Sequence, residues 1–154
     1  MSTRATSSVV GVALLVGITV LSTAAVGTAV LDIVPSESGP PRVSFTASAD
    51  AADDRIALTH RSGESLTVSD LRIEVRIDGE PLAKQPPVPF FAAAGFESGP
   101  TGPFNAAADG TWRAGQTAAI RIAATNSPQL SAGAVVTIRI YTEQYQLASV
   151  TATA

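Results

Sequence analysis

Few side chains in this sequence could do chemistry, and they are widely spread. His60 is the only histidine and cysteine is absent, which excludes a zinc site built from cysteines or from several histidines. Ser62 and Ser65 follow His60 closely, but no nucleophile-elbow pattern surrounds them. We therefore expect His60 to make a structural hydrogen bond at the end of a strand. We expect no catalytic residue, so the protein is not predicted to be an enzyme.

Three carboxylates form the densest acidic group in the chain. Asp50, Asp53 and Asp54 lie within five positions, and clustered carboxylates are the ligands that Ca²⁺ prefers. The segment lacks the glycine spacing of a calcium-binding loop. The pattern therefore predicts a solvated acidic turn and no metal site.

The charge balance and the motifs exclude further classes of function. Ten lysines and arginines stand against thirteen aspartates and glutamates, which gives a net charge of -3. A basic field that could hold a nucleic-acid backbone is therefore missing. Neither a GxGxxG nor a P-loop sequence occurs in the chain. We expect no nucleic-acid partner and no cofactor.

A long apolar segment opens the chain and is its strongest feature. Residues 5–31 carry no charge. A helix over residues 6–34 would reach roughly 40 Å, longer than the hydrocarbon core of about 30 Å. Arg4 precedes this segment, while Asp32 and Glu37 follow it, so the positive-inside rule places the N-terminus in the cytoplasm. We predict a single-pass protein of the cell membrane whose C-terminal part is exported.

A cleaved secretory signal is the main alternative for this segment. Residues 22–24 (Ser-Thr-Ala) and 27–29 (Gly-Thr-Ala) both resemble the small-residue site of a signal peptidase. Against that alternative, the apolar run exceeds the usual length of about 7 to 15 residues, and only one positive charge precedes it. The pattern favours a retained helix.

Small residues recur along the predicted helix. Ala13 and Gly17, and likewise Thr23 and Gly27, are four positions apart and therefore share a face. Small residues at this spacing let neighbouring membrane helices approach closely. Together with Gly11 they are our candidates for helix packing. The alternative is that small residues are simply common in single membrane anchors.

The remainder of the chain has the alternating pattern of β-strands. Residues 35–41 contain Gly-Pro-Pro and predict a hinge. Residues 42–154 then predict a small antiparallel β-sandwich of immunoglobulin-like type. We expect strands at residues 43–47, 56–60, 71–77, 117–123, 135–142 and 146–151, and turns at residues 61–64, 78–79 and 131–133.

Residues 85–112 form a segment rich in proline and phenylalanine. Four of the five phenylalanines fall in it, namely Phe90, Phe91, Phe96 and Phe104. Loops of this length are usually functional or disordered, and the aromatic content argues against plain disorder. We interpret the four rings as a candidate contact surface for other subunits or another partner. The alternative is that they cap one end of the sandwich.

The N-terminal residues also resemble a known family. The sequence RATSSVVGV at residues 4–12, followed by ALLVGITV and by AVGTAVL at residues 25–31, is similar to the N-terminal domain of archaeal type IV pilins, especially the haloarchaeal ones. The resemblance implies that a prepilin peptidase removes a leader at residues 1–5. Arg4 would then be the basic residue of the site, Ala5 the residue before the cut, and Thr6 the first residue of the mature protein.

The exported part is also similar to these pilins. The strand end Thr59-His60-Arg61-Ser62-Gly63 and the turn Trp112-Arg113-Ala114-Gly115-Gln116 carry this second resemblance. It implies a structural subunit, major or minor, of a type IV pilus-like filament involved in surface adhesion or assembly. Its partners would be other pilin subunits, the membrane and the prepilin peptidase. The alternative function is a membrane-tethered extracellular binding module that does not polymerise.

Overall fold

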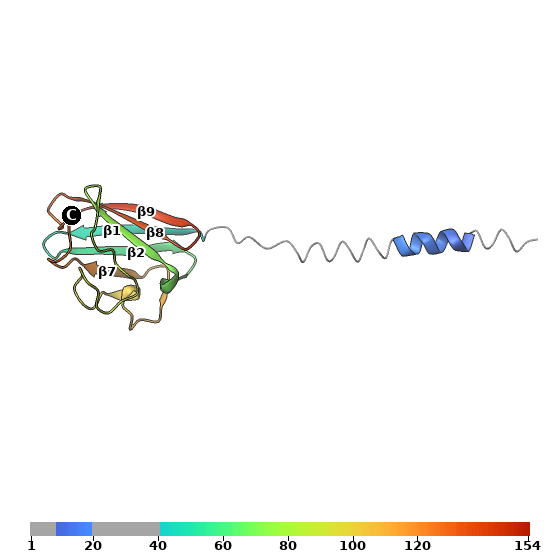
Figure 1. The fold of residues 1–154 in the computed structure, drawn as a ribbon, viewed down its shortest axis with the longest axis horizontal. Helices are drawn as coiled ribbons and strands as arrows, with labels where there is room; N and C mark the ends of the chain where they lie inside the picture. Colours follow the sequence, from blue (N-terminus) through green and yellow to red (C-terminus); the bar gives the residue numbers. More distant parts are fainter. Residues whose placement is uncertain (1–8, 20–40) are drawn as a thin grey trace, which may run out of the picture. The chain divides into compact units, whose positions relative to one another are not determined.

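The computed structural model of the protein describes residues 9–19 and 41–154 (Figure 1). The chain divides into two units, Met1–Gly39 and Pro40–Ala154, and each is considered by itself. Residues 41–154 are called the head below. The predicted leader, nearly all of the predicted hinge and five of the predicted site residues lie outside the described residues. These five are Arg4, Ala5, Thr6, Thr23 and Gly27.

Residues 9–19 form an α-helix whose side chains are all exposed. This stretch contains no proline and no charged residue. The hydroxyl of Thr19 donates hydrogen bonds within the helix, to the carbonyls of Leu15 (2.7 Å) and Val16 (3.0 Å). At about 1.5 Å per residue the described helix is about 16 Å long. Of the predicted helix over residues 6–34, the structure thus describes residues 9–19 only.

Among the residues that the structure describes, no helix combines the length and apolarity needed to cross a membrane.

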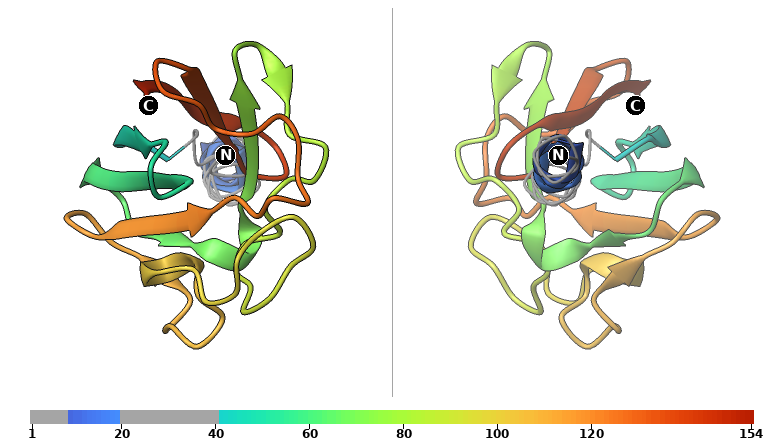
Figure 2. Two further views of the ribbon diagram at one scale, coloured as in Figure 1. Left: turned by 90° about the vertical axis from the view of Figure 1, so that its left-hand side faces the viewer. Right: turned by 90° about the vertical axis from the view of Figure 1, so that its right-hand side faces the viewer.

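The head is built from antiparallel strands. One sheet has the order β1-β2-β7, a second has the order β5-β4-β8-β9, and β3 pairs with β6 in a small third sheet. The two larger sheets form the layers of a small β-sandwich (Figure 2). The strands are β1 (Val43–Asp50), β2 (Arg55–Gly63), β3 (Leu66–Thr67), β4 (Arg72–Ile77), β5 (Glu80–Pro81), β6 (Thr111–Trp112), β7 (Thr117–Arg121), β8 (Val135–Tyr141) and β9 (Gln146–Thr153).

Alternation along β4 and β8 places their apolar residues in the core. Ile73 and Val75 of β4 are buried and pair with Ile140 and Ile138 of β8. Arg72 and its alternate neighbours face outward, as expected for a strand with one wet face. All six strands predicted from alternation are confirmed. The two-residue strands β3, β5 and β6 were not predicted, because two residues carry no period.

The turn predictions are confirmed at two of three places. Asp78 and Gly79 both have positive φ (50° and 85°) between β4 and β5, and Asp78 also accepts a hydrogen bond from the Val135 amide at 2.8 Å. Residues 131–133 form the turn before β8. The turn at residues 61–64 is wrong in position, because β2 continues through Gly63. Gly63 has φ 112°, and a Cβ there would collide with the carbonyl oxygen of Arg42.

Candidate functional site

The proline- and phenylalanine-rich segment is folded onto the sandwich by amide side chains. The Gln85 amide accepts a hydrogen bond from the Val75 N–H (2.7 Å) and donates to the Val75 carbonyl (3.0 Å), as a strand partner would. The buried Asn126 side chain accepts from the Lys84 N–H (3.0 Å) and donates to the carbonyls of Lys84 (2.9 Å) and Gly95 (3.2 Å). These bonds attach the start of the segment to the core.

Three of the four candidate interface phenylalanines belong to the core. The exposed fractions of Phe90, Phe96 and Phe104 are 5%, 6% and 1%. Phe90 contacts Phe96 with ring centroids 5.8 Å apart, and Phe104 contacts Trp112 at 5.0 Å. The contact-surface prediction is therefore wrong for these three residues, because apolar rings gain more from the interior than from water. The three rings belong to the same apolar cluster as the strand residues of the sandwich.

Phe91 is the exception, with 64% of its surface exposed. The backbone of its neighbour is fixed, because the Phe90 N–H donates to the Phe104 carbonyl (2.9 Å) and the Phe90 carbonyl accepts from Ala106 (3.1 Å). Phe91 lies in a bend directly after this bonded residue. Its ring remains at the surface while the ring of Phe90 is buried. Of the predicted surface, Phe91 alone remains available for contact.

His60 is completely buried and has a structural role. Its Nδ1 lies 3.3 Å from the Trp112 carbonyl and its Nε2 lies 3.1 Å from the Ser62 carbonyl. Whichever ring nitrogen carries the proton donates to one of these carbonyls. The ring also stacks on Phe45 at 4.9 Å. The prediction of a structural hydrogen bond is confirmed, but His60 lies inside β2 and not at its end. Ser62 contacts the imidazole through its backbone carbonyl, not its hydroxyl.

The acidic residues between β1 and β2 form a turn. The Asp50 carboxylate accepts a hydrogen bond from the Ala52 N–H at 2.9 Å, and Asp54 has φ 47°. Within residues 9–19 and 41–154, no three histidine, aspartate or glutamate side chains converge as metal ligands would. The Asp50 carboxylate thus closes the turn, while Asp53 stays exposed.

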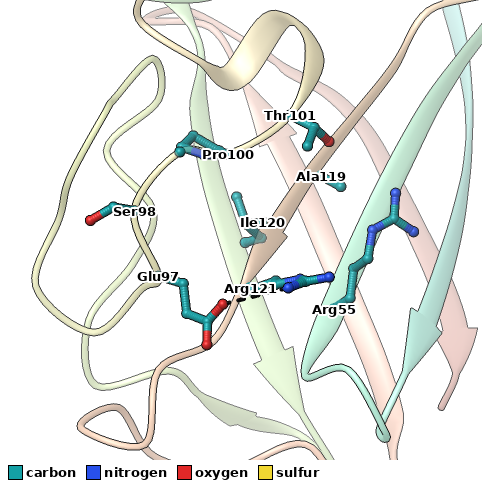
Figure 3. A pocket seen from close by; sticks show the side chains of 9 residues that line it. Arg55, Glu97, Ser98, Pro100, Thr101, Ala119, Ile120 and Arg121 are labelled. Atoms are coloured by element: carbon teal, nitrogen blue, oxygen red, sulfur yellow. Dashed lines mark ion pairs between the residues drawn. The ribbon is translucent and has the colours of Figure 1, made fainter.

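A pocket of about 300 Å³ lies beside β7 (Figure 3). The Glu97 N–H donates to the Arg121 carbonyl (3.0 Å), and Thr101 and Ala119 exchange two backbone hydrogen bonds (2.9 and 3.1 Å). Between these anchors, residues 98–100 face the single residue Ile120. The extra residues cannot follow the strand, so the chain bulges away from β7 and leaves the hollow.

Two arginines lie side by side at this pocket. Arg55 of β2 and Arg121 of β7 are direct partners in the antiparallel register, and both line the pocket (Figure 3). Arg121 lies 3.8 Å from the Glu97 carboxylate, and both side chains are about half exposed. Arg55 forms no ion pair with any described residue.

The sequence analysis missed this pair of arginines. Arg55 and Arg121 are far apart along the chain, at the ends of two strands that alternation had predicted. Only the pairing register of β2 with β7 brings them together, and a sequence pattern does not specify register between distant strands. The one available signal was an arginine at the start of β2 and another at the end of β7, which meet only if these strands are antiparallel neighbours.

The surface of the helix carries the remaining candidates. Gly11, Ala13 and Gly17 are exposed, and a Cβ added at Gly11 or Gly17 would meet no atom within 4 Å. Ala13 and Gly17 share one face, since they are four residues apart. The large apolar residues of the helix are between 54% and 69% exposed, and they are Val9, Val10, Val12, Leu14, Leu15, Val16 and Ile18.

Comparison with protein-family models and with curated proteins finds no match. Function is therefore inferred from the surfaces of the helix and of the head.

Proposed function

We propose that this protein is a membrane-anchored structural subunit, major or minor, of a type IV pilus-like filament. The observation that carries the proposal is the surface of the helix at residues 9–19, where every described side chain is exposed and the large ones are apolar. A surface helix of a soluble protein has a polar face, whereas a helix that is apolar all round belongs in lipid or inside an assembly. A pilin helix occupies both places in turn.

The membrane anchor is the first part of this proposal. Residues 5–31 carry no charge, and a helix over residues 6–34 has the length to span a bilayer. Arg4 on the N-terminal side and Asp32 on the other set the orientation with the C-terminal part outside. The head, a sandwich of immunoglobulin-like type in this proposal, is then exported.

Assembly is the second part. Once helices leave the bilayer, they must pack on one another, and small residues let their backbones come close. Ala13 and Gly17 provide such a strip on one face, with open space at Gly17. The heads would form the filament surface, and the exposed ring of Phe91 offers an apolar contact to a neighbouring head.

A membrane-tethered binding module that does not polymerise is the second candidate. The observation that favours it is the pocket at Arg55 and Arg121, because a head that only builds a filament surface needs no such hollow. Both candidates require the apolar helix to be retained.

The mass of the intact native protein tests the anchor. If a prepilin peptidase acts between Ala5 and Thr6, the mature chain begins at Thr6 and keeps the whole apolar segment. A mature chain beginning after Ala24 or Ala29 would show secretory cleavage and would contradict both candidates.

Substitution of Gly17 by leucine tests assembly. Leucine is at least as favourable in a membrane as glycine, so the amount of membrane-inserted protein should be unchanged. The larger side chain blocks close helix approach, and we expect filament yield to fall about tenfold, as a packing clash of about 1 to 3 kcal/mol implies.

The matched control is Val16→Leu on the adjacent position, where a large side chain is already present. It should leave filament yield near the wild-type level. Normal filaments that contain the Gly17→Leu protein would contradict the packing proposal. Absence of filaments from the wild-type protein as well would favour the tethered module.

A further inference from the structure

We propose that the pocket beside β7 binds a carboxylate-bearing sugar of the uronate type, with Arg55 and Arg121 holding the carboxylate. The site belongs to the head alone. The proposal therefore goes beyond the filament role and applies equally to a tethered module.

The first argument is the unfavourable placement of two positive charges. Arg55 and Arg121 are direct cross-strand partners, and like charges in that position repel each other. Arg55 makes no ion pair in the described part of the chain. Asp50 pairs with Arg55 across β1 and β2, but its carboxylate accepts the Ala52 amide and closes the turn. An anion placed between the two guanidinium groups would relieve this repulsion.

The second argument is the geometry of the groups. Figure 3 shows the side chains of Arg55 and Arg121 on the same side of the sheet, with Thr101 at the far end of the pocket. A guanidinium group presents its N–H donors in a planar fork that matches the two oxygens of a carboxylate. Two such forks from adjacent strands provide donors to one carboxylate.

Glu97 is an internal competitor for the same donors. Its carboxylate lies 3.8 Å from the Arg121 guanidinium, and both side chains are about half exposed. A pair this long and this exposed contributes little to stability. A ligand carboxylate can therefore displace Glu97 at small cost, and the position of Glu97 marks where a carboxylate is accepted.

The size and lining of the pocket indicate a sugar-sized ligand. A volume of about 300 Å³ is far more than a carboxylate group alone would occupy. The Thr101 hydroxyl lines the pocket away from Glu97. The N–H and C=O of Ser98 have no hydrogen-bond partner among the described residues. These groups suit the hydroxyls of a sugar ring.

An NMR titration of the full-length protein in detergent micelles with D-glucuronate tests the proposal. We expect saturable chemical-shift changes with a millimolar dissociation constant. They should be confined to the Arg55 and Arg121 side chains and to the backbone of residues 97–101. D-glucose, acetate and inorganic phosphate are the comparison ligands, and each should bind at least about tenfold more weakly because it lacks either the charge or the ring.

Variants show whether the arginines carry the binding. Arg55→Ala and Arg121→Ala should each weaken glucuronate binding about tenfold. Arg121→Lys keeps the positive charge but lacks the planar fork of donors, so its affinity for glucuronate should lie between those of the wild-type protein and Arg121→Ala. Glu97→Gln removes the competitor and should tighten binding about twofold to fivefold. Arg139→Ala is the matched control, since Arg139 is also a strand arginine near a carboxylate (Glu74, 4.0 Å), and it should change nothing.

Four results would overturn the proposal. They are no saturable shift with glucuronate, equal binding of glucose, equal binding of acetate or phosphate, and equal losses in the Arg121→Lys and Arg139→Ala variants. Unchanged shifts in β8 of each variant verify that the head is folded. Filament formation is not part of this readout, so failure here leaves the filament proposal standing.

Discussion

In the helix at residues 9–19 the large apolar side chains are exposed, whereas in the head most valines, leucines and isoleucines are buried and Val135 is an exposed exception. Leu14 and Ile18 of the helix are 60% and 56% exposed, while Ile138 and Ile140 of β8 are fully buried. Burying such a side chain contributes about 1.5 to 3 kcal/mol relative to leaving it in water. The head buries most of its large apolar side chains within its own fold. Within the described part of the chain, the helix leaves its large apolar side chains exposed.

The apolar surfaces of the head and of the helix at residues 9–19 must be covered by different kinds of neighbour. Strands of the head alternate, so each has one apolar face that a second sheet covers. The helix is apolar on every face, which a single neighbouring sheet could not cover. Lipid or several other helices would satisfy it, in agreement with the proposed function.

The largest expected effect comes from placing a charge in the head. Ile138→Asp would bury an unpaired carboxylate between the sheets, which costs several kcal/mol out of a total stability of about 5 to 15 kcal/mol. We expect the head to unfold. Trp112 is the only tryptophan of the chain and is fully buried in the head, so its fluorescence reports the loss. A normal thermal transition would contradict the assigned core.

The same charge in the helix should act differently. Leu14→Asp should leave the thermal transition of Trp112 fluorescence unchanged, because Leu14 is exposed. It should reduce recovery of the protein in the membrane fraction, since a central aspartate disfavours insertion by about 2.5 to 3.5 kcal/mol. If Leu14→Asp lowered the melting temperature and left membrane recovery normal, Leu14 would contribute to the fold of the head and not to the membrane anchor.

Two phenylalanines of one loop sharpen the comparison within the head. Phe104→Ala should lower the free energy of unfolding by about 3 to 5 kcal/mol, because it removes a buried ring and leaves a cavity. Phe91→Ala should change it by less than about 0.5 kcal/mol, since its ring is exposed. Thermal melting of the full-length protein in detergent measures both. Equal losses would show that Phe91 is also part of the core.

The smallest expected effect concerns an ion pair on the solvent-exposed surface of the head. A hydrogen bond from Arg113 (2.6 Å), with a second from the Thr111 amide, lowers the pKa of Asp109 below its ordinary value. A lowered folded-state pKa stabilises the fold above the unfolded-state pKa, of about 4, and this contribution disappears as the pH falls through the folded-state value.

An NMR titration of the Asp109 carboxyl checks this prediction. Its midpoint should lie below that of an ordinary aspartate and should rise in Arg113→Gln. The melting temperature at pH 7 should hardly change in that variant, because both side chains are more than half exposed. An unshifted midpoint in the wild-type protein would contradict the ion pair.

Strands and their core residues were predictable from the sequence where the alternation of apolar and polar residues extended over enough positions. Residues 71–77 alternate apolar and charged side chains, and the structure buries Ile73, Val75 and Ile77. The extent of β2 was not predictable, because Arg61 and Ser62 read as the start of a turn. Pairing of Gly63 with Val43 of β1 extends the strand, and that pairing depends on a segment distant in the sequence.

The aromatic loop shows where composition was insufficient. Proline and phenylalanine predicted a structured, non-random segment, and the hydrogen bonds of Gln85 and Asn126 confirm that it is ordered. Composition did not distinguish Phe90 from Phe91. Their separation follows from backbone bonds between Phe90, Phe104 and Ala106, which exist only in the folded head.

The sequence by itself determined the helix at residues 9–19 and the longer antiparallel strands, because each depends on residue type and local spacing. It also indicated a structural role for His60, although the Trp112 and Phe45 contacts of that ring come from the tertiary structure. The tertiary structure decided which rings are buried, where β2 ends and that Arg55 and Arg121 meet at one pocket. These features depend on register between strands that are far apart in the chain. Register is set by the packing of the whole sandwich, which a local pattern does not contain.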